Sequence, residues 1–184
     1  LITDKEFTRF FDVIVRGAGE VPLVDLLKAK SLEELKMIPS TYVNINGVVH
    51  SPEVKSVDAP IDNPTPDFSD LPMEKYILPR PLSLQITKGC YWNKCTFCVH
   101  TFANKSYRKR TYEDYIRDID TLVEKYNPMT IVFTDLSHSP KILSDMSDWI
   151  INKGYRFRWF VFVRFEDALS FEILEKMKKA GCER

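Results

Sequence analysis

Three of the four cysteines in the chain lie within nine residues, in the run GCYWNKCTFC that contains Cys90, Cys95 and Cys98. A disulfide between such close neighbours would close a very small loop, so cross-linking is a poor use of these residues. Thiolates are strong ligands for zinc and for iron–sulfur clusters. We therefore expect the three cysteines to bind a metal ion or a metal cluster.

Two kinds of metal site fit the trio. Three thiolates can each bind one iron of a four-iron cluster and leave the fourth iron open to an exogenous ligand. Alternatively, His100 could complete a structural zinc site. Zinc sites usually pair cysteines from two separate knuckles, and this sequence has only one such run, so the pattern favours the iron–sulfur cluster. The fourth cysteine, Cys182, is predicted to be a small buried residue rather than a ligand.

The composition is that of a globular protein, with 44% hydrophobic and 28% charged residues. The formal net charge is zero, so no overall attraction to nucleic acid or to an anionic membrane follows. No apolar run approaches the ~20 residues that span a bilayer. Asp4, Lys5 and Glu6 interrupt any signal-peptide pattern. With clustered cysteines and no export signal, we expect a cytoplasmic protein.

A repeated strand–helix pattern surrounds the cysteines. Alternating Leu82, Leu84 and Ile86 predict a strand before them, and an apolar stripe predicts a helix over 111–126 after them. The pattern then continues as strand 129–133, helix 139–154, strand 155–163 and helix 170–181. Such alternation predicts a parallel sheet, whose carboxyl edge is where sites are usually built. Three units cannot close an eight-stranded barrel, so the α/β fold class expected is a partial TIM-like barrel, as a fragment of a larger protein.

The first part of the chain has a different pattern. A capping box predicts a helix over 3–10, followed by a strand at 12–16, a helix over 21–30 and a second capping box at Ser31 and Glu34. Asn46-Gly47 predicts a β-hairpin over 42–50. Residues 51–81 hold seven of the eleven prolines, which indicates an extended linker. We therefore divide the chain into 1–50, the linker 51–81 and the strand–helix region 82–184.

The cysteine run resembles the radical S-adenosylmethionine superfamily, in which three cysteines follow the first barrel strand and an aromatic residue, here Phe97, precedes the last. The four-residue spacer between Cys90 and Cys95 is one residue longer than the common form. The run GCYWNKCTFC is similar to the subgroup whose barrel follows a cobalamin-binding domain. DVIVRGAGEVPLVDLL resembles the end of that Rossmann-like domain, with Ala18 where the family usually has Glu. The resemblance makes residues 1–50 the end of a cobalamin-binding-like domain.

The resemblance implies specific roles for several residues. Cys90, Cys95 and Cys98 would ligate a 4Fe-4S cluster whose open iron binds S-adenosylmethionine. Reductive cleavage of that cofactor would give a 5′-deoxyadenosyl radical. Phe97 would lie beside the adenine. Asp135 and Arg164 are at the ends of the second and third strands, where the family has residues that bind the same cofactor, so we expect them to bind it too.

The resemblance also implies partners. Cobalamin would be bound mainly by residues outside this chain, an electron donor such as flavodoxin or ferredoxin would supply electrons, and the substrate would be a peptide or a small molecule that is methylated or otherwise modified. With three barrel units, the segment is not expected to turn over substrate alone. Two alternatives stay open: a radical enzyme without cobalamin, and a zinc-knuckle scaffold that uses the basic run Lys105, Arg108, Lys109 and Arg110 to bind a partner.

Overall fold

The computed structural model describes residues 10–52, 61, 63–77, 81–100 and 106–183. The chain divides into two compact units, Leu1–Pro60 and Ile61–Arg184, which are described separately. The division falls inside the proline-rich segment 51–81. Among the described residues, none of the helices combines the length and the apolar character that a bilayer crossing requires.

The first unit contains an antiparallel sheet in the order β1-β2-β3 and two short helices. Its elements are β1 (Val13–Val15), α2 (Glu20–Lys28), α3 (Leu32–Met37), β2 (Thr41–Ile45) and β3 (Val48–His50). The turn between β2 and β3 places Asn46 and Gly47 at φ 51° and 83°, the left-handed region that a tight hairpin turn of this kind requires. The hairpin predicted from Asn46-Gly47 is therefore confirmed. The helix predicted over 3–10 lies almost entirely outside the described residues.

The second capping box is also present, since the Ser31 hydroxyl accepts a hydrogen bond from the Glu34 amide at 3.2 Å and α3 begins at the next residue. All pairings described in the first unit are antiparallel. The end of a Rossmann-like cobalamin domain therefore stays a prediction for residues 1–50.

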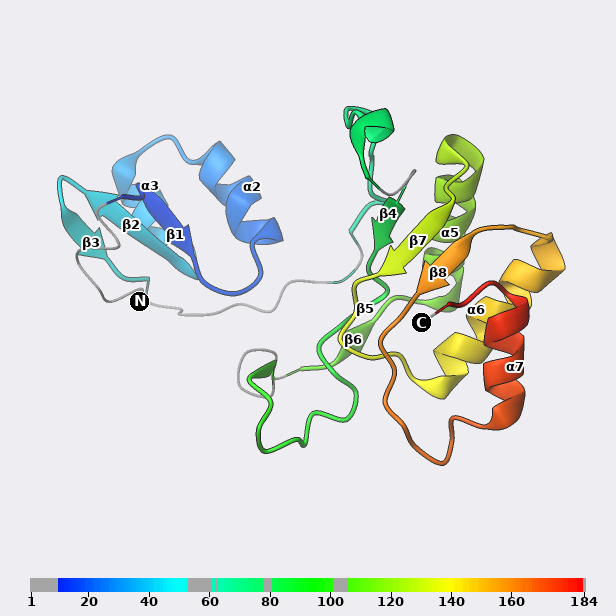
Figure 1. The fold of residues 1–184 in the computed structure, drawn as a ribbon. Helices are drawn as coiled ribbons and strands as arrows, with labels where there is room; N and C mark the ends of the chain where they lie inside the picture. Colours follow the sequence, from blue (N-terminus) through cyan, green and yellow to red (C-terminus); the bar gives the residue numbers. More distant parts are fainter. Residues whose placement is uncertain (1–9, 53–60, 62, 78–80, 101–105, 184) are drawn as a thin grey trace. The chain divides into compact units, whose positions relative to one another are not determined.

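The second unit is built around a parallel sheet in the order β4-β7-β8 (Figure 1). Along the chain, a helix follows each of these three strands. Its elements are η1 (Met73–Lys75), β4 (Pro81–Leu84), β5 (Thr87–Lys88), β6 (Arg108–Lys109), α5 (Tyr112–Tyr126), β7 (Thr130–Phe133), α6 (Pro140–Lys153), β8 (Arg158–Phe160) and α7 (Phe171–Lys179). Cys182 forms a further parallel bridge with Trp159. The parallel strand–helix order is thus present, and closure into a TIM-like barrel stays a prediction.

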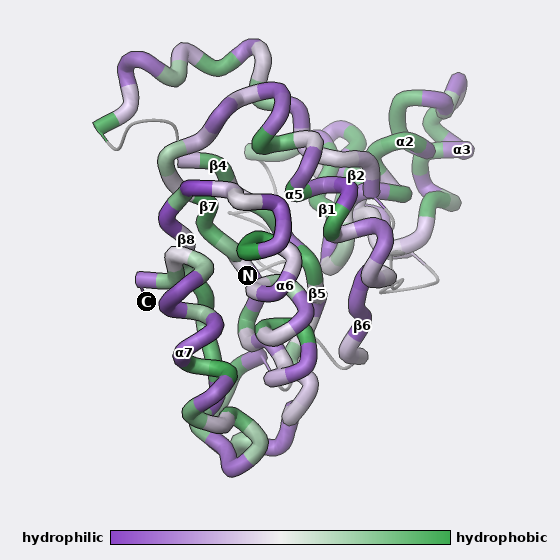
Figure 2. The backbone as a smooth tube through the Cα atoms, turned by 90° about the vertical axis from the view of Figure 1, so that its right-hand side faces the viewer, coloured by the Kyte–Doolittle hydropathy of each residue, from purple (hydrophilic) through white to green (hydrophobic). Residues whose placement is uncertain are grey.

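The core of this unit lies between the sheet and its helices. The central side chains of the three strands, Leu82, Ile131 and Trp159, have no exposed surface. Ile119 and Leu122 of α5 are equally buried, because residues three or four apart share one face of a helix. Figure 2 shows the strands β4 and β7 as mostly hydrophobic, whereas α7 alternates between hydrophobic and hydrophilic residues. The strands and helices that the sequence predicts in alternation therefore pack as two layers, with helices against a sheet.

Part of the proline-rich segment packs on the second unit. Arg110, which is 6% exposed, donates hydrogen bonds to the carbonyls of Ile61 and Asn63 at 3.2 and 2.7 Å. Its guanidinium also forms a buried ion pair of 3.0 Å with Asp118, and Asp118 accepts a hydrogen bond from the Thr65 hydroxyl. A buried charge must be paired in this way to offset its desolvation. Residues 61 and 63–65 are therefore bound to Arg110 and to Asp118 of α5.

Candidate functional site

The cysteines lie in a loop whose two ends are tied together. We call residues 89–100 and 106–107 the cysteine loop. At its base, the antiparallel strands β5 and β6 pair Thr87 with Lys109 and Lys88 with Arg108. The Arg110 amide adds a hydrogen bond of 2.9 Å to the carbonyl of Ile86. Figure 1 shows the loop leaving the sheet at the edge toward which β4 and β7 run. The cysteine loop therefore occupies the carboxyl edge of the parallel sheet, where binding sites of α/β folds are usually found.

Gly89 makes the entry into this loop possible. Its φ is +85°, a conformation that only glycine adopts at low cost. A Cβ atom at this position would lie 2.6 Å from the backbone oxygen of Ser106, at the opposite end of the loop. The two ends of the loop can therefore approach each other only because residue 89 has no side chain.

The three loop cysteines are half-buried, and none of the four cysteines of the chain forms a disulfide. The Cys98 amide donates a hydrogen bond of 3.3 Å to the Cys95 carbonyl, which folds that part of the loop into a turn. Within the described residues, no three His, Cys, Asp or Glu side chains are gathered into a metal-binding arrangement. The donor set itself, three thiols on a single closed loop, fits an iron–sulfur cluster.

Asp135 binds the strand end that precedes the cysteines. Its Oδ1 atom accepts hydrogen bonds from the backbone amides of Ile86, at 3.0 Å, and Thr87. The other oxygen, Oδ2, lies 3.2 Å from Nε2 of His138, and both side chains are completely buried. An ionised carboxylate can be buried when it accepts charge-assisted hydrogen bonds of this kind. The structure therefore places Asp135 beneath the base of the cysteine loop.

Arg164 lies against the spacer between Cys90 and Cys95. Its guanidinium is 4.0 Å from the ring centre of Trp92 and forms an ion pair of 2.5 Å with Glu166. Glu166 also accepts a hydrogen bond of 2.6 Å from the Tyr91 hydroxyl. Burial raises the pKa of Tyr91, and the hydrogen bond to Glu166 raises it further, so this phenol stays protonated at neutral pH.

The loop exposes two large apolar side chains beside the cysteines. Phe97 is 89% exposed and Val99 is 68% exposed, although both are large hydrophobic residues. Tyr107 lies on the inner side, with its hydroxyl buried and without a hydrogen-bond partner among the described residues. Burial raises the pKa of Tyr107 to about 12, and the negative charge of Asp135 contributes to this rise. The loop thus combines thiols with an exposed aromatic ring that could cover a flat ligand.

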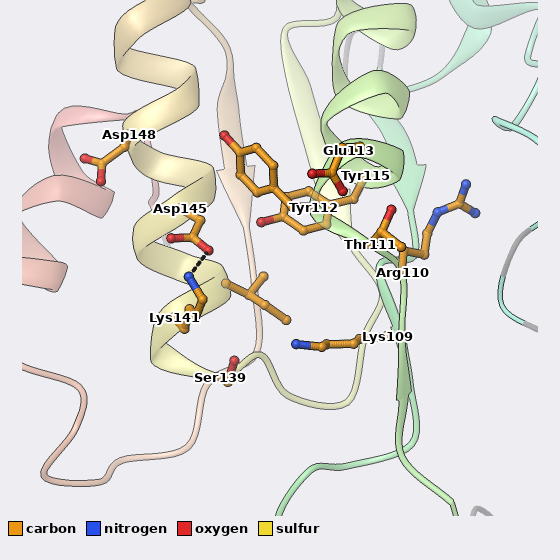
Figure 3. Close-up of a pocket in the computed structure, with 11 residues that line it drawn as sticks. Lys109, Arg110, Thr111, Tyr112, Glu113, Tyr115, Ser139, Lys141, Asp145 and Asp148 are labelled. Atoms are coloured by element: carbon orange, nitrogen blue, oxygen red, sulfur yellow. Dashed lines mark hydrogen bonds and ion pairs between the residues drawn. The ribbon is translucent and has the colours of Figure 1, made fainter.

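A separate cavity of about 570 Å³ lies beside the N-terminal turns of α5 and α6 (Figure 3). None of the cysteines lines it. Its charged residues are of both signs, with Lys109 and Lys141 against Glu113, Asp145 and Asp148. Figure 3 shows the Arg110 side chain directed away from the other residues drawn, and Lys141 paired with Asp145. Because side chains of both charges line it, the cavity indicates no ligand class, and the cysteine loop remains the candidate site.

Two curated proteins are similar in sequence to this chain. The chain is 25% identical over 186 residues to the anaerobic magnesium-protoporphyrin IX monomethyl ester cyclase of Cereibacter sphaeroides, which covers 94% of the chain and 30% of that protein. It is 28% identical over 125 residues to the 4'-phospho-dehydrooxetanocin synthase of Priestia megaterium, which covers 67% of the chain and 15% of that protein. No family model matches the sequence.

Among solved structures, the cobalamin-dependent S-adenosylmethionine radical enzyme OxsB, with aqua-cobalamin and S-adenosylmethionine bound, aligns with 99% of the chain at a TM-score of 0.74 and 18% identity. The radical S-adenosylmethionine methyltransferase TsrM from Kitasatospora setae, with tryptophan and a cofactor analogue bound, aligns with 95% of the chain at a TM-score of 0.67 and 20% identity. Both solved structures are of radical S-adenosylmethionine enzymes, and one of them, OxsB, is cobalamin-dependent.

The resemblance stated from the cysteine run is thereby confirmed. The chain spans 28% of OxsB and 37% of TsrM, and under a third of either curated relative. At these identities the solved structures establish a shared mixed α/β fold. None of these proteins supports the zinc alternative.

Of the residues that the sequence singled out, the cysteines, Phe97 and Arg164 share one region of the second unit, whereas Asp135 lies beneath it. Their cofactor contacts stay predictions. Sequence reasoning missed two residues of this region. Glu166 binds Arg164, and His138 lies close to Asp135. The only available signal was position, since His138 and Glu166 lie three and two residues beyond the predicted strand-end residues.

Proposed function

We propose that the second unit of this chain is the cluster-binding part of a cobalamin-dependent radical S-adenosylmethionine enzyme. The observation that carries the proposal is the placement of three cysteines on one closed loop at the carboxyl edge of a parallel sheet. The relationship to OxsB and TsrM, whose structures bear S-adenosylmethionine or its analogue, supports it. A scaffold that binds zinc would not need its thiols at this edge.

Cys90, Cys95 and Cys98 would hold the 4Fe-4S cluster, and the fourth iron would remain open to S-adenosylmethionine. When bound, such a cluster supplies the electron that cleaves this cofactor to methionine and a 5′-deoxyadenosyl radical. The protein's part in this chemistry is to bind the cofactors and to orient them. Each thiol must lose its proton before it ligates iron, so cluster uptake should be weaker at acid pH.

Phe97 and Arg164 are the proposed contacts to S-adenosylmethionine. The 89% exposure of the Phe97 ring leaves one face open for an adenine. The Nε atom of Arg164 is buried without a hydrogen-bond partner among the described residues, so it could donate to a carboxylate. Asp135 would contribute less directly. Its Oδ1 already binds two backbone amides, which fixes the strand that leads into the cysteines.

The remaining parts of the proposal concern the whole enzyme. Residues 1–50 would be the end of a cobalamin-binding-like domain, with the cobalamin bound mainly by other parts of the protein. Flavodoxin or ferredoxin would supply electrons, and the substrate would be a peptide or a small molecule. The tryptophan in the TsrM structure is an example of a substrate in a related enzyme. A cytoplasmic location is part of the same proposal.

Anaerobic reconstitution of the chain with iron and sulfide tests the proposal. The wild-type chain should take up about four iron and four sulfide per molecule. The reduced protein should give the electron paramagnetic resonance signal of a 4Fe-4S cluster, and S-adenosylmethionine should change that signal. The reason is that the cofactor binds directly to the open iron.

The matched variants are a triple Cys90, Cys95 and Cys98 substitution to alanine and the single change Cys182→Ala. The triple variant should lose iron uptake. Cys182→Ala should retain it, because Cys182 lies beside Trp159 rather than in the cysteine loop. A colourless wild-type protein that holds one zinc and takes up no iron would exclude the proposed function.

A further inference from the structure

The spacer between Cys90 and Cys95 is held from a distant part of the chain. Two of its four residues, Tyr91 and Trp92, contact the segment that follows β8. Arg164 stacks on Trp92 at 4.0 Å, and its Cζ atom lies 5.9 Å from the ring centre of Tyr91. Glu166 binds Arg164 and Tyr91 at once, through separate carboxylate oxygens. We call these four residues the spacer clasp.

The contacts of the spacer clasp form a closed circuit. The Glu166 carboxylate neutralises the guanidinium of Arg164 and also accepts a hydrogen bond of 2.6 Å from the Tyr91 hydroxyl, so one carboxylate holds both side chains. The guanidinium and carboxylate side chains are 29% and 17% exposed, so solvent screens the pair only in part. Arginine suits this position because a planar cation can stack on an indole ring and donate hydrogen bonds from its edge.

The clasp is anchored in the sheet. The segment after β8 is paired with the segment after β7, through a parallel bridge between Val163 and His138 and a 3.2 Å hydrogen bond from the His138 amide to the Phe162 carbonyl. Arg164 therefore follows a residue whose backbone is fixed. In contrast, Trp92 is 39% exposed and lies outside the strands of the described residues. Because the segment that carries Arg164 is held by the sheet, Arg164 and Glu166 restrain the spacer rather than the reverse.

We propose that Arg164 and Glu166 are positioning residues that hold the spacer through Trp92 and Tyr91 and thereby set the separation of the Cys90 and Cys95 thiols for cluster binding. This inference rests on the proposed function. Tyr91 and Trp92 then serve to anchor the four-residue spacer, and Glu166 becomes part of the site. This role is compatible with a contact between S-adenosylmethionine and the Nε edge of Arg164, because the clasp uses the guanidinium face and another nitrogen.

The test measures how fast a chelator removes iron from the reconstituted chain in the absence of S-adenosylmethionine. A direct contact between Arg164 and that cofactor cannot then contribute to the rate. Arg164→Gln and Glu166→Gln should each accelerate iron loss roughly tenfold or more, as loss of groups that support metal ligands usually does. Arg164→Lys, which keeps the charge and loses the planar stack, should fall between Arg164→Gln and the wild type. The electron paramagnetic resonance signal should broaden in the same order.

Arg158→Gln is the matched control, because Arg158 is at the opposite end of β8 and pairs with Glu183 at 3.8 Å. It should release iron at the wild-type rate. The circular dichroism of all variants should match that of the wild type, which separates loss of the clasp from unfolding. The double variant Arg164→Gln, Trp92→Leu should lose iron no faster than the faster single variant, since both changes break one contact.

The outcomes separate the two proposals. A wild-type chain that takes up no iron overturns the proposed function and the role of the clasp together. A wild-type chain that binds the cluster while Arg164→Gln and Glu166→Gln release iron as slowly as Arg158→Gln overturns the clasp alone. Multiplied effects of Arg164→Gln and Trp92→Leu would also overturn it, because they would show that Arg164 acts independently of the spacer.

Discussion

The parallel sheet of the second unit and the loop that leaves its first strand differ in how their side chains are stabilised. Leu82, Ile131 and Trp159 in the sheet have no exposed surface, whereas Trp92 and Phe97 in the cysteine loop are 39% and 89% exposed. The sheet is stabilised mainly by removal of apolar surface from water. The loop depends on a few particular contacts: the β5–β6 ladder, the carboxylate of Asp135 and the spacer clasp.

This difference separates stability from function. Damage to the sheet should unfold the unit and remove the site with it. Damage to the loop should leave the unit folded and affect metal binding.

Trp159→Ala should destabilise the second unit severely. The indole is fully buried, and its Nε1 atom donates a 2.9 Å hydrogen bond to the Ala180 carbonyl. Removal of a buried aromatic side chain usually costs about 3–5 kcal/mol. Urea unfolding followed by circular dichroism should therefore show a loss of this size or no folded protein at all. Phe165→Ala, which truncates a side chain that is 89% exposed, should stay within about 0.5 kcal/mol of wild type. Equal losses in both variants would contradict the burial argument.

Gly89→Ala should damage the loop more than the sheet. The new Cβ atom would lie 2.6 Å from the Ser106 oxygen in a backbone with φ of +85°, so the ends of the cysteine loop must separate. We expect a loss of about 2 kcal/mol in the free energy of unfolding, from strain of this kind, and a loss of most iron uptake upon reconstitution. Circular dichroism should remain that of a folded protein.

Gly154→Ala is the control for this substitution. Gly154 also has a positive φ, of +68°, but a Cβ atom there would contact nothing within 4 Å. The variant should lose less stability, because only the backbone strain applies, and it should take up iron normally. If Gly89→Ala took up iron as well as Gly154→Ala, the closure of the loop would not matter for the site.

The sequence was informative where one element carries its own pattern. The apolar stripe with Ile119 and Leu122 predicted α5, and Ser139-Pro140 predicted where α6 begins. The proximity of the cysteines predicted a metal site without any knowledge of the fold. These signals are local, because hydrophobic spacing and capping residues act within a few residues of one another.

Contacts between distant segments had no such signal. Arg108 and Lys109 belong to a basic run in the sequence, but in the structure they form β6 and close the cysteine loop. Two-residue strands show no periodicity. Tyr91 and Glu166 are 75 residues apart, so their hydrogen bond depends on the parallel order of the sheet. The spacer clasp could therefore be recognised only in the folded structure, although the sequence already shows the residues that form it.

Tyr107 lies at the end of the cysteine loop, directly before β6, and substitutions that change its ionisation should have the smallest effect. Burial raises its pKa to about 12, with a further contribution from the charge of Asp135. A tyrosine in an unfolded chain ionises near pH 10. The neutral phenol therefore stabilises the folded state fully below about pH 10, and this contribution is lost as the pH rises toward 12.

Tyr107→Phe cannot ionise, so its free energy of unfolding should fall less steeply than that of wild type between about pH 9.5 and 11. Asp135→Asn should lower the pKa of Tyr107, because the neighbouring negative charge is removed. Parallel stability curves for wild type and Tyr107→Phe would mean that this phenol is open to solvent, and the inner side of the cysteine loop would then be no better packed than its exposed face.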